Sequence, residues 1–139
     1  MIEVKHLTKK YGSGVAVSDL SFKVESGKIY GFLGPNGAGK STTMNIIAGC
    51  LAPTEGQVLV GGYDICEEPD EAKRLIGYLP EQPPLYPDMT PEEYLTFVGR
   101  AKGLRGAELH EEIEYVMDAT CIGGMRNRLI KNLSKGYKQ

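Results

Sequence analysis

The sequence predicts an α/β fold that carries an antiparallel β-subdomain and a helical subdomain. Residues 29–33 are apolar throughout, which is typical of a strand buried on both faces of a sheet. A glycine-rich loop and an amphipathic helical pattern follow this run directly. Polar and apolar residues alternate over 2–7 and again over 16–24, the period of half-buried strands. Helical patterns dominate the chain after residue 90.

Composition narrows the class of protein. With 139 residues, 41% of them hydrophobic and 24% charged, the chain is long enough for one ordinary globular domain. No apolar run approaches the roughly 20 residues that span a bilayer, and the N-terminus does not resemble a signal peptide. The net charge of −2 comes with scattered Lys and Arg, which disfavours nucleic acid as a partner. Cys50, Cys66 and Cys121 lack any C-x-x-C spacing and indicate reduced thiols in a cytosolic protein.

The strands are expected in this order along the chain. Turn residues at 11–14 join the two alternating runs and predict an antiparallel pair. A short strand is expected at 57–60, turned by Gly61 and Gly62, and another at 75–79. The apolar members of the second run are Val17, Leu20, Phe22 and Val24.

The first helix is expected directly after the glycine-rich loop. Its apolar stripe at spacing i, i+3, i+4 and i+7 consists of Met44, Ile47, Ala48 and Leu51. Gly49 and Pro53 are expected to end it.

The composition changes at Pro80, because five of the eight prolines lie between residues 80 and 91. We therefore predict a core over 1–80 and a helical subdomain over 81–139. Thr90, Pro91 and Glu93 form a capping-box pattern that starts a helix. The buried face of this helix is expected at Tyr94, Leu95, Val98 and Ala101. A second helix is expected to bury Leu109, Ile113, Val116 and Met117 and to end at Gly123 and Gly124.

Residues 34–41, Gly-Pro-Asn-Gly-Ala-Gly-Lys-Ser, match the phosphate-loop pattern G-x-x-x-x-G-K-[ST]. In such a loop the backbone N–H groups and the start of the following helix converge on phosphate oxygens. Lys40 would reach the β and γ phosphates, Ser41 would ligate Mg²⁺, and Thr42 would donate to the α phosphate. A chance glycine-rich turn is disfavoured by the buried strand before it and the helix after it. The expected phosphate-binding residues are Asn36, Gly37, Ala38, Gly39, Lys40, Ser41 and Thr42.

Two further segments narrow the choice among phosphate-loop proteins. With the loop, Ile-Gly-Tyr-Leu-Pro-Glu at 76–81 and Leu-Ser-Lys-Gly-Tyr-Lys-Gln at 133–139 resemble the nucleotide-binding subunit of an ATP-binding cassette (ABC) transporter. The resemblance covers the whole chain in the family's motif order. It implies a phosphate-loop NTPase fold of the ABC-ATPase type. No Asp-x-x-Gly follows the loop and no Asn-Lys-x-Asp occurs, which disfavours a GTPase.

The resemblance also implies roles for residues outside the loop. Tyr11 would stack on adenine with Ala16 as an apolar neighbour, although a strand-end aromatic packed on the core is the alternative. Glu81 or Gln82 would act in the Q-loop, near Mg²⁺ or the attacking water; Glu81 occupies the usual glutamine's place, and both remain candidates. Ser134 and Gly136 match the signature motif that meets ATP on a partner subunit. An N-cap serine of an unrelated helix is the alternative there.

By this resemblance the protein binds ATP and Mg²⁺ and couples ATP hydrolysis to transport. Its partners would be permease subunits and a second nucleotide-binding subunit, and it would lie on the inner face of the membrane. The family's Walker B carboxylates and switch histidine are expected beyond Gln139, so we expect an N-terminal portion without hydrolysis residues. His6 and His110 are expected to be ordinary, His110 on the exposed side of a helix. Two alternatives stay open: a soluble ABC ATPase not linked to transport, and a phosphate-loop phosphotransferase.

Overall fold

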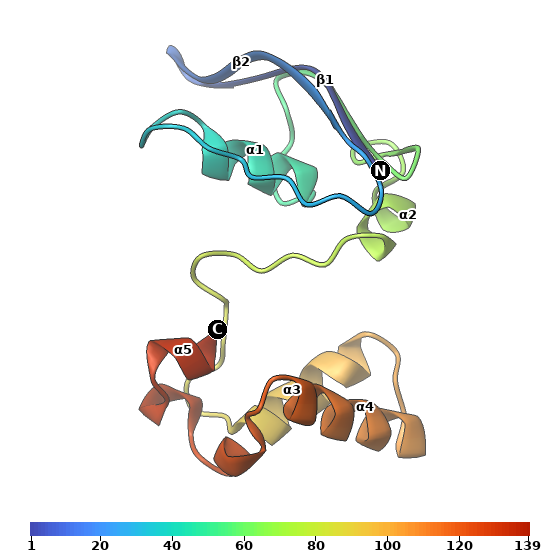
Figure 1. Cartoon of the computed structure of the whole chain (residues 1–139), viewed down its shortest axis with the longest axis vertical. Helices are drawn as coiled ribbons and strands as arrows, with labels where there is room; N and C mark the ends of the chain where they lie inside the picture. The colour runs from blue at the N-terminus through green and yellow to red at the C-terminus, as the bar shows by residue number, and fades with distance from the viewer. The chain divides into compact units, whose positions relative to one another are not determined.

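The computed structural model describes all 139 residues and divides them into two compact units, an N-terminal unit of residues 1–78 and a C-terminal unit of residues 79–139 (Figure 1). Each unit has its own hydrophobic core. No helix is long and apolar enough to cross a membrane.

The N-terminal unit contains one antiparallel sheet with the strand order β2-β1-β3-β4. The strands are β1 (Ile2–Tyr11), β2 (Gly14–Val24), β3 (Glu55–Val60) and β4 (Tyr63–Asp64). The predicted antiparallel pair is confirmed, and both strands are longer than expected because the ladder runs up to the two-residue turn, where Tyr11 pairs with Gly14. The strand expected at 57–60 and its turn at Gly61–Gly62 are confirmed by β3 and β4.

An irregularity in β1 decides which residues enter the core. Val4 and Leu7 are both buried, although a regular strand would place positions three apart on opposite faces. The register of β1 against β2 shifts between these two residues, and His6 has a φ of 50°. On β2, Asp19 has a φ of 46°, and its Oδ1 lies 2.8 Å from His6 Nδ1. This paired bulge turns Leu7 to the same face as Val4.

Helix α1 (Lys40–Ile47) packs on the sheet, and its buried residues are Thr43, Ile46 and Ile47 (Figure 1). The expected stripe is wrong at its ends: Met44 is 44% exposed, and Leu51 lies beyond the helix. The helix ends early because Gly49 takes a φ of +68°, as its predicted role as a stop requires.

Two predicted strands are absent. Residues 29–33 and 75–79 contain no strand. The side chains of Ile29 and Leu33 are 104% and 91% exposed, so the first segment is not a buried strand here. A strand needs a neighbouring strand to receive its backbone hydrogen bonds, and no strand of the chain pairs with either segment. Helix α2 (Pro69–Arg74), with Pro69 in its first turn, lies directly before the segment at 75–79.

The C-terminal unit contains helices α3 (Pro91–Ala101), α4 (Gly106–Ala119) and α5 (Lys135–Lys138), with 3-10 turns η1 (Gly123–Met125) and η2 (Ile130–Asn132). The capping box is confirmed: Glu93 N–H donates to Thr90 Oγ1 (3.3 Å), and Thr90 N–H donates to Glu93 Oε2 (2.8 Å).

Helices α3 and α4 pack against each other (Figure 1). Leu109, Ile113 and Met117 are buried as predicted, and Val116 is half-buried. On α3 the expected face is half-buried except for Ala101, which is exposed. Helix α3 also meets α4 at the buried Gly99, where an added Cβ would lie 2.4 Å from Leu109 Cδ1.

Candidate functional site

Two left-handed glycines shape the loop before α1. Gly37 has a φ of +83° and Gly39 a φ of +82°, a region that other residues enter only with strain. Gly39 is also the N-cap of α1, which has no side-chain cap and no acidic residue in its first turn. The first N–H groups of the helix therefore meet neither a capping oxygen nor a carboxylate, and their partial positive charge stays available.

The end of the loop rests directly on β2. A Cβ atom at Gly39 would lie 2.3 Å from the carbonyl oxygen of Ala16 and 2.8 Å from Cγ2 of Val17. At Gly37 an added Cβ would meet nothing within 4 Å. The structure thus brings Ala16, a residue expected at the site, against the loop that holds Lys40.

The Lys40 side chain folds back across the loop. Its ammonium donates to the carbonyl oxygens of Gly34 (2.7 Å) and Pro35 (2.7 Å), and it forms no salt bridge with a carboxylate. An uncompensated cation next to free N–H groups makes this end of α1 electropositive. Such a site attracts anions.

The helix start is anchored by a residue that sequence reasoning missed. Thr43 is buried, and its Oγ1 and N–H donate to the carbonyl oxygen of Gly39 at 2.9 and 2.8 Å. A hydroxyl residue four positions after the N-cap glycine was the available signal, because a threonine can bond back to the i−4 carbonyl. Of the remaining expected residues, Asn36, Ala38 and Ser41 are exposed and Thr42 is half-buried.

Tyr11 ends β1 at the tip of the hairpin and is 55% exposed. Its ring lies 5.3 Å from the ammonium of Lys9 and takes no part in the hydrophobic core of the N-terminal unit. The alternative that Tyr11 is a core-packed aromatic is therefore wrong. Because the Lys9 ammonium lies over one face of the ring, the opposite face is the one that can contact a ligand.

The other expected residues lie in the C-terminal unit, whereas Tyr11, Ala16 and the loop belong to the N-terminal unit. Glu81 and Gln82 are both exposed and line a cavity of about 290 Å³ with Lys135 and Gln139. Their exposure gives no preference between them.

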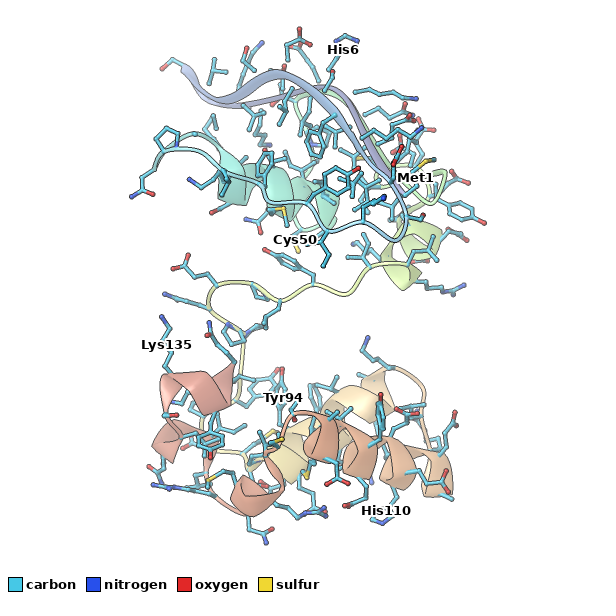
Figure 2. The ribbon with its side chains drawn as sticks, viewed as in Figure 1. Met1, His6, Cys50, Tyr94, His110 and Lys135 are labelled. Atoms are coloured by element: carbon cyan, nitrogen blue, oxygen red, sulfur yellow. The ribbon has the colours of Figure 1, made fainter.

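Ser134 is the N-cap of α5, and its Oγ accepts a hydrogen bond from the N–H of Tyr137 (3.4 Å). Gly136 lies in the same short helix and is exposed, as is Lys135 (Figure 2). His6 and His110 are exposed on their own units, and His110 lies on the outer side of α4 as predicted (Figure 2).

Ionisable groups elsewhere are held by local contacts. The Arg126 guanidinium, which bonds to Glu114 and Glu92, lowers the pKa of the Glu114 carboxyl. Burial would raise the pKa of Asp64, but hydrogen bonds from Cys66, Gln57 and Glu67 lower it overall. No group of three or more His, Cys, Asp or Glu side chains could hold a metal ion.

The chain is similar in sequence to ABC transporter proteins. The family model described as "ABC transporter" matches residues 17–139. The whole chain is 40% identical to the probable multidrug ABC transporter ATP-binding protein YbhF of Escherichia coli and covers 24% of it. It is 36% identical to the linearmycin resistance ATP-binding protein LnrL of Bacillus subtilis and covers 45% of that protein. The chain thus spans less than half the length of these two relatives.

Solved structures show the same fold. An ATP-binding subunit of an ABC transporter superposes with a TM-score of 0.84 at 33% identity, covering 99% of this chain and 57% of that one. The dimeric bacterial ABC transporter cassette MJ0796 superposes with a TM-score of 0.81 at 28% identity, covering 97% of this chain and 64% of that one. A dimeric form of MJ0796 bound to ADP and phosphate gives 0.82 at 26% identity, covering 96% and 63%.

Proposed function

The chain belongs to the ABC transporter family and has the fold of its ATP-binding subunits, and from this premise we propose that residues 36–42 bind the phosphates of ATP. The observation that carries the proposal is the Lys40 ammonium, held across the loop by two carbonyl oxygens at the uncapped start of α1. When a triphosphate enters, its oxygens replace these carbonyls as acceptors for the ammonium. The charge on Lys40 then offsets that of the phosphates.

The residues present fit a magnesium nucleotide. The exposed Ser41 hydroxyl follows Lys40 and is the protein ligand that the loop offers to Mg²⁺. Because no carboxylate or histidine cluster could bind the ion alone, Ser41 would hold it together with phosphate oxygens. Glu81 and Gln82 remain the candidates for a further oxygen ligand. The ion supplies charge neutralisation on the phosphates.

The base would lie on Tyr11. This ring is half exposed, is absent from the core, and ends the strand next to the turn that leads into β2. Ala16 is a small residue whose carbonyl touches the loop, so it can border the base without blocking it. Stacking does not distinguish adenine from guanine, so Tyr11 contributes affinity and not base selectivity.

The proposed physiological role is to couple ATP binding and hydrolysis to transport across a membrane. Its partners would be a second nucleotide-binding subunit and permease subunits, which hold it at the cytoplasmic face. Two observations support this: MJ0796, which has the same fold, was solved as a dimer, and both curated relatives carry transport or resistance names. Ser134 and Gly136 would contact the nucleotide bound on the second copy.

We infer that residues 1–139 by themselves do not turn over ATP and are poorly stable. The N-terminal unit exposes Ile29 and Leu33 almost completely, and such exposed apolar segments promote association. Phosphate release and thermal melting of residues 1–139, measured beside the protein expressed from its full reading frame, test both statements. Magnesium-dependent turnover by residues 1–139, abolished by Lys40→Ala, would overturn the first statement. A melting temperature equal to that of the full protein would overturn the second.

The nucleotide site itself is tested by titrating a fluorescent ATP analogue. Lys40→Ala should lower affinity about 10- to 150-fold, the equivalent of about 1.5–3 kcal/mol for hydrogen bonds to a charged group. Lys28→Ala removes an exposed lysine from the turn before the loop and should leave affinity unchanged. Equal affinity in the Lys40 variant and the parent would show that the loop is not the site.

A further inference from the structure

Two segments of the C-terminal unit that are far apart in sequence are joined by backbone hydrogen bonds. The first is the proline-rich loop of residues 81–89, and the second is the segment of residues 129–134 that ends at Ser134. The N–H of Ile130 donates to the carbonyl oxygen of Met89 (2.9 Å), and the N–H of Lys131 donates to that of Pro87 (2.9 Å). Two consecutive N–H groups of the second segment therefore bond to the first segment.

An ion pair also links these two segments. Lys131 Nζ donates to Asp88 Oδ1 at 2.8 Å, so Lys131 binds the loop through both its backbone and its side chain. On the other side of Ser134, Gln139 Nε2 donates to the carbonyl oxygen of Glu81 (3.3 Å), which is a second link to the loop. Lys138 Nζ donates to the carbonyl oxygen of Lys131 (3.2 Å) and so ties the two ends of the Ser134 segment together. Ser134 thus lies between two points of attachment.

Both of the linked segments are conformationally restricted. Pro83, Pro84 and Pro87 fix their backbone φ angles within the loop. The loop leads directly into the capped start of α3 at Thr90. In the second segment Ile130 is buried, with 4% exposed. Ser134 lies only three residues after Lys131. A displacement of the loop should therefore displace Ser134 as well.

We infer that Asp88 and Lys131 are a positioning pair that sets the place of Ser134 according to the position of the loop at residues 81–89. This rests on the proposed function, in which Ser134 meets a nucleotide held by a second copy of the chain. Neither residue belongs to the proposed nucleotide site. Their part is to keep the N-cap hydroxyl of α5 in register with the loop that contains Glu81 and Gln82.

The test uses the protein expressed from its full reading frame with a non-hydrolysable ATP analogue. Two quantities are measured: analogue affinity at protein concentrations where it is monomeric, and analogue-driven dimerisation by sedimentation. Asp88→Ala and Lys131→Ala should each weaken dimerisation about two- to fivefold, the size expected of an exposed ion pair, and leave analogue affinity unchanged. The charge swap Asp88→Lys with Lys131→Asp should restore dimerisation.

Control variants separate the two levels of the inference. Lys102→Ala and Glu112→Ala remove exposed charges that form no ion pair and should leave dimerisation unchanged. Ser134→Ala should weaken dimerisation strongly. Unchanged analogue affinity in Lys40→Ala would reject the proposed function. The positioning pair alone would be rejected by a different result. In that case Lys40→Ala lowers analogue affinity and Ser134→Ala weakens dimerisation as expected, but the Asp88 and Lys131 variants have no effect on dimerisation or the charge swap does not restore it.

Discussion

Gly39 lies so close to Ala16 that a Cβ atom at position 39 would sit 2.3 Å from the Ala16 carbonyl oxygen. Gly37, two residues earlier, has nearly the same left-handed φ, but an added Cβ there meets nothing within 4 Å. The two glycines of one loop are therefore required for different reasons. Gly37 supplies a backbone conformation, and Gly39 also supplies room for β2.

This difference predicts two levels of destabilisation. Gly37→Ala should cost about 1–2 kcal/mol for the left-handed backbone alone. Gly39→Ala should cost more, because β2 or α1 must also move to relieve the clash with Ala16. Chemical denaturation of the two variants in the full protein measures both values, and Gly37→Ala serves as the matched control. Equal losses would show that the contact with Ala16 relaxes at no cost.

A second prediction concerns Tyr11. Tyr11→Ala should lower nucleotide affinity by about 1–3 kcal/mol, the range for a base stacked on an aromatic ring, and to a similar extent for ATP and GTP. Tyr11→Phe keeps the ring and should retain the affinity. Titration with the two nucleotides and with inorganic triphosphate measures the effect. An equal loss for inorganic triphosphate would mean that Tyr11 supports the fold and does not stack on the base.

The capping box of α3 gives a third prediction. Thr90→Ala removes the acceptor for the N–H of Glu93 and should lower the free energy of unfolding by about 1 kcal/mol. Thr96→Ala, within the same helix, replaces threonine by a better helix former and should be neutral or stabilising. Urea unfolding followed by circular dichroism compares the two. A neutral Thr90 variant would show that water satisfies the N–H equally well.

The Glu114–Arg126 pair makes stability depend on pH. Arg126 lowers the pKa of Glu114 in the folded protein, so the pair is fully stabilising above the usual glutamate pKa of about 4.3 and loses its effect as pH falls through the lowered value. Glu114→Gln should therefore melt below the parent at pH 6, and the difference should shrink below about pH 4.

The control for this prediction is Glu111→Gln, which changes an exposed carboxylate of the same helix that forms no ion pair. Its melting temperature should follow that of the parent over the same pH range. A difference between Glu114→Gln and the parent that stays constant from pH 6 to pH 3 would show that the pair does not stabilise through the charge of Glu114.

Features that depend on neighbours in the sequence could be predicted from the sequence by itself. The capping box at Thr90 and Glu93, the left-handed glycines of the loop and the turn after Val60 each involve residues within a few positions of one another. Their hydrogen bonds and φ angles depend on residues within one short segment of the chain, so the sequence of that segment is enough to predict them. The resemblance to ABC proteins rested on such local motifs and was confirmed by the family match.

Features that depend on distant partners were decided by the tertiary structure. Residues 29–33 have the composition of a buried strand, yet no strand pairs with them, since composition does not supply a partner. Leu7 enters the core because bulges at His6 and Asp19 change the strand's period, and the bond between Asp88 and Lys131 joins segments that no sequence spacing relates. In each case the physical reason is the same: a backbone or side-chain group finds its partner only after the chain has brought remote segments together.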